Sequence, residues 1–428
     1  RATRRIDRVL MPILALTVML QFQDKFSLGY TLVMGMTKDI GMSRAQYSWA
    51  GSIFYFGYLS CQPVAALLLQ RFSVIRYLYI NCFVWGVIMC CHAAVQGPQS
   101  MLTLRFLLGF FEGGLIPCTT LLTANFYAKH QIVARSAILQ CMNGVSILFG
   151  APMAYGLLKN GGLVIESWRV MFLILGAVTV VLSLLIALVL APSPKEARFL
   201  LADERTALDD MLKQTSVDAT QGKGDARQQV VEALTDVRLY LMWLLPFAVS
   251  ITNGGITVFN TALIQSFGFS SAQSILLTMP SGAIQVISVF IYVGLFRLTG
   301  TRAAGAITCL VLSVIGGGLV VGGVGNQAAS MTGILMVVFY VQSLACCVAY
   351  IATNVGGHTK RVVFATSFQV AYAAGNIVGP QTYRPKDAPK YVPAQIAILV
   401  TLSSALALLV AITFFHWLWN RQRDSRGD

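Results

Sequence analysis

Charged residues are scarce in this chain. Of its 428 residues only 11% are charged while 56% are hydrophobic, and the mean hydropathy is +0.69. This balance excludes a soluble globular protein, because apolar stretches of about 20 residues, long enough to cross a bilayer, recur along the sequence. The stretches are too long and too numerous for a signal peptide. The composition therefore predicts an all-α polytopic membrane protein.

Patterns that hold metals or carry out catalysis are also lacking. All nine cysteines fall inside predicted spans, where they act as small apolar residues, and their spacing fits neither a metal site nor disulfides. The four histidines are scattered, and we expect His92 and His416, near span ends, at the membrane interface. Without convergent nucleophiles or metal ligands, we expect no enzyme activity, no metal and no cofactor.

Apolar length, together with breaks at glycine, proline and charged residues, predicts twelve membrane-spanning helices. The predicted spans are 9–34, 46–70, 77–96, 99–127, 131–158, 167–191, 237–266, 271–296, 302–322, 328–352, 360–384 and 391–419. A hydrophilic stretch separates them into two six-helix halves, 1–191 and 237–428, joined by a linker at 192–236. Paired arginines and a Gly/Pro motif recur at offsets of 226–229 residues, as in the parallel repeats of the major facilitator fold.

Basic residues concentrate on one side of the predicted membrane. There are 22 on the side of both termini and the linker, against seven on the other side, so we expect both termini and the linker in the cytoplasm. The net charge of +14 follows mostly from this topology, and we expect the lipid bilayer, not nucleic acid, as the partner. We expect a monomer in the plasma membrane. Because the chain begins at Arg1 and not at Met, we also expect trimmed ends.

Four charged residues fall deep inside predicted spans: Asp24 and Lys25 in the first, and Arg105 and Glu112 in the fourth. A charge at the bilayer centre costs at least ~2.5–3.5 kcal/mol, which favours a functional role. Arg105 and Glu112 share one helix face, about 10.5 Å apart, while Gln21, Asp24 and Lys25 crowd one sector of the first helix. From their depths we expect Arg105 to reach Asp24, which leaves Glu112 without a permanent partner and free to exchange a proton. The alternative is an ionic network that only joins two helices, although apolar packing often does this as well.

Other polar side chains at membrane depth are weaker candidates. Each suits a hydrogen bond between helices as well as a ligand contact. They are Tyr55, Tyr58, Asn143, Asn253, Asn260, Gln285, Asn354, Gln369 and Asn376.

Two runs of sequence resemble a known family. The run RFLLGFFEGGLIP, from Arg105 to Pro117, resembles the R-F-x-x-G-x-x-E-G pattern of the anion:cation symporter family within the major facilitators. The run from Gly357 to Tyr391 resembles the fungal, allantoate-permease-like branch, with G-x-T-K-R, then G-N-I-x-G-P-Q, then A-P-x-Y. The start, RRIDRVLMPILALTVMLQFQDKFSLG, is similar to the family's entry into its first helix, so the resemblance covers essentially the whole chain.

The resemblance implies a proton-coupled symporter that imports a small organic carboxylate, such as a vitamin or a ureide, by alternating access. Asp24 and Glu112 would carry protons, and Lys25 and Arg105 would deal with the substrate carboxylate. Lys25 stands where relatives often have arginine, which makes recognition of a planar carboxylate looser. Further substrate contacts are expected from Gln21, Tyr55, Tyr58, Asn253, Asn354 and Asn376. The alternative is a proton-driven exporter of a fungal metabolite, because the same fold works in both directions.

Six basic residues are predicted at the cytoplasmic mouth, where a gate would close. They are Arg71, Arg76, Arg297, Arg302, Lys360 and Arg361. Few acidic residues lie near them in the sequence, so we expect helix ends and carbonyl groups to hold them in the closed state. The loop LLLQRFSVIRY lacks the acidic residue and the glycines that many facilitators have there, which departs from the usual gate pairing.

Overall fold

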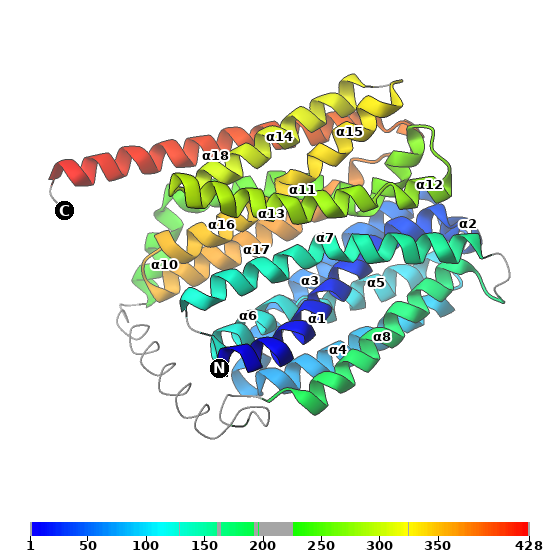
Figure 1. The fold of residues 1–428 in the computed structure, drawn as a ribbon, viewed down its shortest axis with the longest axis horizontal. Helices are drawn as coiled ribbons and strands as arrows, with labels where there is room; N and C mark the ends of the chain where they lie inside the picture. The colour runs from blue at the N-terminus through cyan, green and yellow to red at the C-terminus, as the bar shows by residue number, and fades with distance from the viewer. Residues whose placement is uncertain are drawn as a thin grey trace. The chain divides into compact units, whose positions relative to one another are not determined.

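The computed structural model describes residues 2–127, 129–160, 164–191, 196, 226–323 and 325–426 (Figure 1). Within these ranges, twelve helices are long and apolar enough to cross a membrane. They are Thr3–Val33, Arg44–Arg71, Val74–Ala94, Pro98–Phe126, Ala134–Lys159, Ser167–Val189, Val237–Ser266, Ser271–Thr299, Arg302–Gly322, Gln327–Asn354, Thr359–Gln381 and Val392–Leu418. Their ends agree closely with the predicted spans except at the first, which begins earlier, so the twelve-helix prediction is confirmed.

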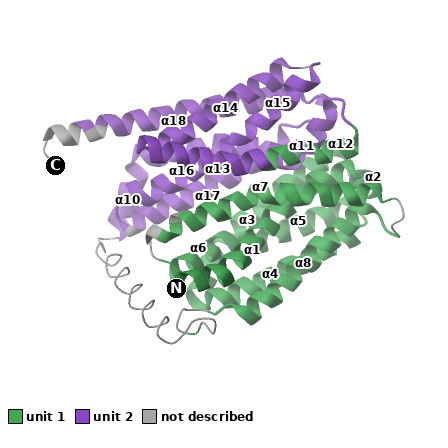
Figure 2. Ribbon diagram, in the orientation of Figure 1, with its two compact units in different colours: residues 1–221, 270–282 green, residues 222–269, 283–428 purple. Residues whose placement is uncertain are grey.

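Two compact units make up the chain (Figure 2). The first contains Arg1–Gln221 and Ser270–Gly282, and the second contains Gly222–Phe269 and Ala283–Asp428. The division falls inside the segment 192–236, which the sequence predicts as a linker, and most of that segment lies outside the described residues. Its described end forms helix α10, which packs against α17 in the second unit.

The first unit is a bundle whose helices pack mainly in the pairs α1 with α7, α3 with α5 and α4 with α8. Its elements are α1 (Ala2–Val33), α2 (Met36–Asp39), α3 (Arg44–Arg71), α4 (Val74–Cys91), η1 (His92–Ala94), α5 (Pro98–Glu112), α6 (Leu115–Phe126), α7 (Lys129–Lys159), α8 (Ser167–Val189) and α12 (Ser271–Leu276). Helix α12 packs against α7.

Glycines set the spacing between α3 and α5. A Cβ atom at Gly57 would collide with the Phe106 carbonyl, and one at Gly109 would collide with the Phe54 carbonyl. Because neither position has room for a side chain, the two backbones approach closely. This contact fixes the position of α5, which carries two of the four intramembrane charges.

The second unit is built around the pair α11 and α17. Its elements are α10 (Ala226–Thr235), α11 (Val237–Ser266), α13 (Met279–Thr299, whose first residues belong to the first unit), α14 (Arg302–Gly322), α15 (Gln327–Val337), η3 (Val338–Tyr340), α16 (Val341–Asn354), α17 (His358–Gln381), η4 (Pro385–Asp387) and α18 (Val392–Arg426). A Cβ at Gly254 would lie 2.7 Å from the Asn376 carbonyl oxygen, and Gly375 is as tightly enclosed by α11. The glycines of the G-N-I-x-G-P-Q run therefore serve helix packing.

Candidate functional site

A buried ion pair joins α1 to α5 in the first unit. The Nζ atom of Lys25 lies 2.6 Å from Oε1 of Glu112, and the two side chains are 9% and 0% exposed. The Lys25 ammonium also lies 5.2 Å from the centre of the Phe22 ring and 5.7 Å from that of Phe54. The expectation that Glu112 has no permanent partner is therefore wrong, because the depth argument considered only the pairing of Arg105 with Asp24 and overlooked the reach of the Lys25 side chain.

Asp24 has a different partner from the expected one. Its Oδ2 atom accepts a hydrogen bond from the indole Nε1 of Trp85 on α4. Its other oxygen, Oδ1, is buried without a hydrogen-bond partner. Among the described residues no ion pair joins Asp24 to Arg105, so that predicted pairing is wrong. Tryptophan is common near membrane surfaces, but Trp85 lies in the middle of its span. This unusual position is the sequence signal that could have identified Trp85 as a partner of an intramembrane charge.

Arg105 is buried with part of its guanidinium group unpaired. Only 2% of the residue is exposed, and its Nε and Nη2 atoms have no hydrogen-bond partner in the described part of the chain. The guanidinium carbon lies 5.8 Å from the centre of the Phe172 ring on α8. Nε and Nη2 point along one edge of the guanidinium plane, and such an edge fits the two oxygens of a carboxylate. The structure thus offers an unused anion-binding edge inside the first unit.

The other predicted contacts of the first unit are also buried. Gln21 lies one turn before Lys25 on α1 and is 2% exposed. Tyr55 and Tyr58 are buried on α3, with their ring centres 6.4 Å apart. The carbonyl of Tyr58 closely approaches Gly113, the residue after Glu112.

His92 lies near the end of the span Val74–Ala94, as the sequence predicts. It is fully buried at the end of α4, and its ring lies 5.1 Å from the ring of Phe172. His416 on α18 contacts Tyr350 on α16 in the second unit. Within the described residues, no three His, Cys, Asp or Glu side chains gather as metal ligands would.

Two of the three predicted asparagines of the second unit bond to each other. Asn253 on α11 donates to Oδ1 of Asn376 on α17 at 2.7 Å, and it accepts a hydrogen bond from the hydroxyl of Tyr340 at 2.8 Å. Asn376 also donates to the Tyr372 carbonyl. Asn354 is not part of this group, because it is the exposed last residue of α16 and bonds within its own turn.

The predicted gate residues of the second unit fall into two groups. Arg302 donates to the Ala349 carbonyl at 3.1 Å and Arg361 to the Val355 carbonyl at 3.1 Å, so a carbonyl of α16 and one of the residue that follows it bind these two side chains. Lys360 differs, because its ammonium lies 2.6 Å from Glu232 and 3.0 Å from Asp236. Arg297 is exposed, and so are the two predicted gate residues of the first unit, Arg71 and Arg76.

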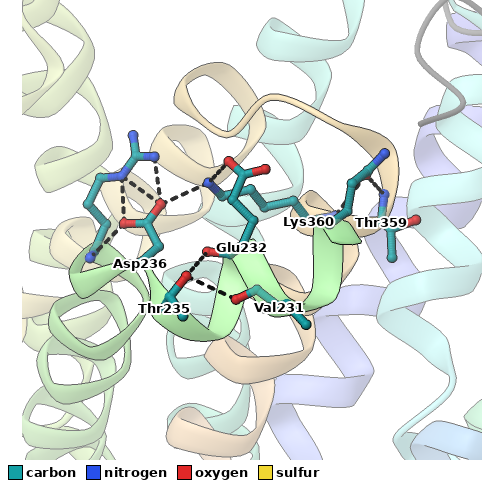
Figure 3. A network of polar contacts seen from close by, with 8 residues as sticks. Val231, Glu232, Thr235, Asp236, Thr359 and Lys360 are labelled. Carbon is teal, nitrogen blue, oxygen red and sulfur yellow. Dashed lines mark hydrogen bonds and ion pairs between the residues drawn. The ribbon is translucent and has the colours of Figure 1, made fainter. Parts of the chain in front are cut away.

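The acids near Lys360, drawn in Figure 3, were not predicted because they lie far from Lys360 in the sequence. Glu232 and Asp236 come from α10 and the turn after it, about 125 residues earlier in the chain, and converge on Lys360 (Figure 3). Gln229 of α10 also accepts from the backbone N–H groups of Thr359 and Lys360, at 2.9 and 3.3 Å, and so caps the start of α17.

Asp236 is the acid most strongly held in this network. Its carboxylate accepts hydrogen bonds from Nε and Nη2 of Arg238 at 2.9 and 2.6 Å. Burial alone would raise the pKa of Asp236, but the hydrogen bonds from Arg238 and Lys360 outweigh it and lower the pKa to about 2. Asp236, the N-cap residue of α11, therefore stays charged, and the turn between α10 and α11 remains bound to Lys360 of α17 by charge at physiological pH.

Comparison with known proteins identifies the family. Residues 14–380 match the sequence model of the Major Facilitator Superfamily. The allantoate permease of Saccharomyces cerevisiae is 31% identical, with 98% of this chain and 80% of the permease aligned. The thiamine pathway transporter THI73 of the same yeast is 30% identical, over 100% of this chain and 82% of that protein.

Solved structures agree with this result at the level of the fold. The xylose transporter XylE from E. coli, in a partially occluded inward-open conformation, aligns with a TM-score of 0.69 and 12% identity over 92% of this chain and 95% of its own. A bacterial homologue of the lysosomal transporter Spinster aligns with a TM-score of 0.67 and 14% identity over 96% of both chains. The chain belongs to the major facilitator superfamily. It is a transporter and not an enzyme, as the sequence predicted.

Proposed function

We propose that this protein is a proton-coupled symporter that imports a small organic carboxylate by alternating access. The observation that supports this most is the buried Lys25–Glu112 ion pair on the same unit as the unpaired edge of Arg105. One acid is paired with a cation that an anionic substrate would also attract. The Glu112 carboxylate and the substrate carboxylate therefore compete for the same lysine, and a proton on Glu112 removes the first of these competitors.

Coupling follows from this competition. A proton on Glu112 removes the negative charge that holds the Lys25 ammonium, and Lys25 then joins Arg105 as a second cation for the substrate carboxylate. Because linkage is reciprocal, a bound anion in turn favours the protonated form of Glu112. Loss of the proton restores the ion pair and helps to expel the anion. Asp24 is the second proton carrier, since Trp85 binds only one of its oxygens.

The net charge that crosses the membrane with each substrate molecule decides which gradients drive uptake. One monovalent anion with one proton is electroneutral, so uptake is driven by the pH gradient, at about 1.4 kcal/mol per pH unit, and by the gradient of the anion itself. A second proton on Asp24 would add the membrane potential, at about 2.3 kcal/mol per 100 mV.

The similarity to an allantoate permease makes allantoate, a ureide, the first substrate to test. Gln21, Tyr55 and Tyr58 would supply polar contacts beside the charged groups. The excess of basic residues near the termini supports a cytoplasmic location for both ends, and we propose a monomer in the plasma membrane.

A screen followed by transport assays tests the proposal. Thermal shifts of the purified protein with small carboxylates, allantoate included, at acid and neutral pH identify binders, since a ligand at 100 times its Kd adds about 2.7 kcal/mol of stability. In proteoliposomes, acid outside should then drive accumulation, and a protonophore should abolish it. Glu112→Gln should still exchange substrate but lose this accumulation.

Two results would count against the proposal. The first is accumulation by Glu112→Gln protein under a pH gradient alone, which would remove Glu112 as the coupling residue. The second is substrate movement outward against its gradient in right-side-out vesicles, which would make the protein an exporter.

A further inference from the structure

His92 has one ring nitrogen in use and one unused. Its Nδ1 atom lies 2.8 Å from the carbonyl oxygen of Ile88, and because a carbonyl only accepts, Nδ1 carries the hydrogen. In the neutral ring, Nε2 then holds a lone pair and can only accept. This atom is buried and has no hydrogen-bond partner. Buried polar atoms are nearly always paired, so an unpaired one calls for an explanation.

The His92 ring and the Arg105 guanidinium lie against the same aromatic side chain of the first unit. The ring of Phe172 contacts both residues, with its centre 5.1 Å from the His92 ring and 5.8 Å from the Arg105 guanidinium carbon. Helices α4 and α5 are packed neighbours joined by η1 and a short turn, and His92 precedes Pro98 by about as many residues as Arg105 follows it. The two side chains are therefore at a similar depth.

Arg105 and His92 thus present complementary groups to which no described residue of the first unit is hydrogen-bonded. The Nε and Nη2 edge of Arg105 offers two donors to a carboxylate, and Nε2 of His92 offers one acceptor. A plain carboxylate would satisfy the first group and leave the second unpaired. A ligand with a carboxylate at one end and an N–H or O–H donor further along would satisfy both.

We propose that His92 is a specificity residue, and that Nε2 accepts a hydrogen bond from a donor group of the same substrate whose carboxylate binds Arg105. The substrate class is then a small carboxylate that carries an amide, ureido or hydroxyl donor. This inference rests on the proposed function, because it takes Arg105 as the carboxylate site.

Two probes of nearly equal shape test the inference. N-carbamoylglycine has an N–H and an NH₂ donor, whereas 4-oxopentanoate has CH₂ and CH₃ in their places and keeps the carboxylate and the ketone oxygen. Binding of each to the full-length protein in lipid nanodiscs is measured by calorimetry. The parent should bind N-carbamoylglycine more tightly by about 2- to 12-fold, the range for one net hydrogen bond. His92→Phe should abolish this preference and leave the affinity for 4-oxopentanoate within about twofold.

Two further variants make the result specific. His92→Gln supplies a carbonyl oxygen as acceptor and should restore part of the preference, and it provides a second reading if His92→Phe fails to fold. His416→Phe makes the same substitution in the second unit and should leave the ratio of the two affinities unchanged.

The outcomes distinguish a failure of the His92 inference from a failure of the carboxylate site at Arg105. If Arg105→Gln abolishes binding of both probes while His92→Phe keeps the parent's preference, His92 is not a specificity residue and the anion site stands. Equal affinities for both probes in the parent also overturn the role of His92, because a protonated Nε2 would bind either carbonyl oxygen. If the parent binds neither probe, or if Arg105→Gln changes nothing, the carboxylate site fails and the His92 inference fails with it.

Discussion

The ammonium of Lys25 lies 2.6 Å from the carboxylate of Glu112, and both side chains are buried. Removing one member of a buried ion pair leaves an uncompensated charge and typically costs about 3–5 kcal/mol, whereas replacing both members costs much less. The pair is therefore a point where stability and transport are linked.

We predict that Lys25→Met lowers the unfolding free energy of the detergent-solubilised protein by about 3–5 kcal/mol at neutral pH. Glu112→Gln should cost less, because the amide oxygen still accepts a hydrogen bond from Lys25. The double variant Lys25→Met/Glu112→Gln should be more stable than Lys25→Met alone. Losses that simply add in the double variant would show that the two side chains do not interact.

The sequence predicted the twelve helices because apolar length and helix breakers are local properties of the chain. It also identified all four intramembrane charges, since such residues are rare enough to stand out. It did not predict how the four charges pair. Whether Arg105 or Lys25 is the partner of a given acid depends on how each helix is rotated and on differences of a few ångströms in how far each side chain reaches. The acids that bind Lys360 were missed for a related reason, as they come from α10 and the turn after it, inside a segment that was predicted as a linker.

Arg105 should contribute more to anion affinity than Lys25 does. Two charge-assisted hydrogen bonds from its Nε and Nη2 edge would be lost in Arg105→Gln, so we expect the Kd of the substrate carboxylate to rise about 100-fold or more. Lys25→Arg keeps the charge and should change the Kd by less than about 10-fold. Calorimetric titration of both variants with one carboxylate decides the order. Unchanged affinity in Arg105→Gln would rule out the assigned carboxylate site.

The asparagines of the second unit should differ sharply in their effect on stability. Asn253→Ala leaves the hydroxyl of Tyr340 and Oδ1 of Asn376 without a partner between packed helices, so we expect a loss of about 1–3 kcal/mol. Asn354→Ala, at the exposed end of α16, is the matched control and should change stability by less than about 0.5 kcal/mol. Thermal unfolding of the two proteins measures this. Similar small effects for both would mean that the Asn253 network does not hold α11 to α17.

Arg302 offers a test of the predicted gate. Arg302→Gln removes the donor to the Ala349 carbonyl, and we expect a changed balance between inward-open and outward-open states with substrate affinity preserved. Cysteine-accessibility labelling from the cytoplasmic side reports that balance, and Arg297→Gln, at an exposed position in the same loop region, shows the effect of charge alone. Labelling of Arg302→Gln protein that matches the parent would count against a gating role.

The contact between α17 and the turn that joins α10 to α11 should weaken in acid. Asp236 has a pKa of about 2 in the folded protein, below its value of about 3.9 in an unfolded chain, so its charge stabilises the fold at all pH values above about 5. This contribution is lost as the pH falls from about 4 through 2, because the folded state then takes up the proton as well. We therefore expect Asp236→Asn to be less stable than the parent above pH 5, and the difference in unfolding free energy to shrink below pH 4.

Glu232→Gln is the control, since the Glu232 side chain is 61% exposed and its pair with Lys360 should contribute about 1 kcal/mol or less. A stability difference between parent and Asp236→Asn that stays constant from pH 7 to pH 3 would show that Asp236 is not held in this way.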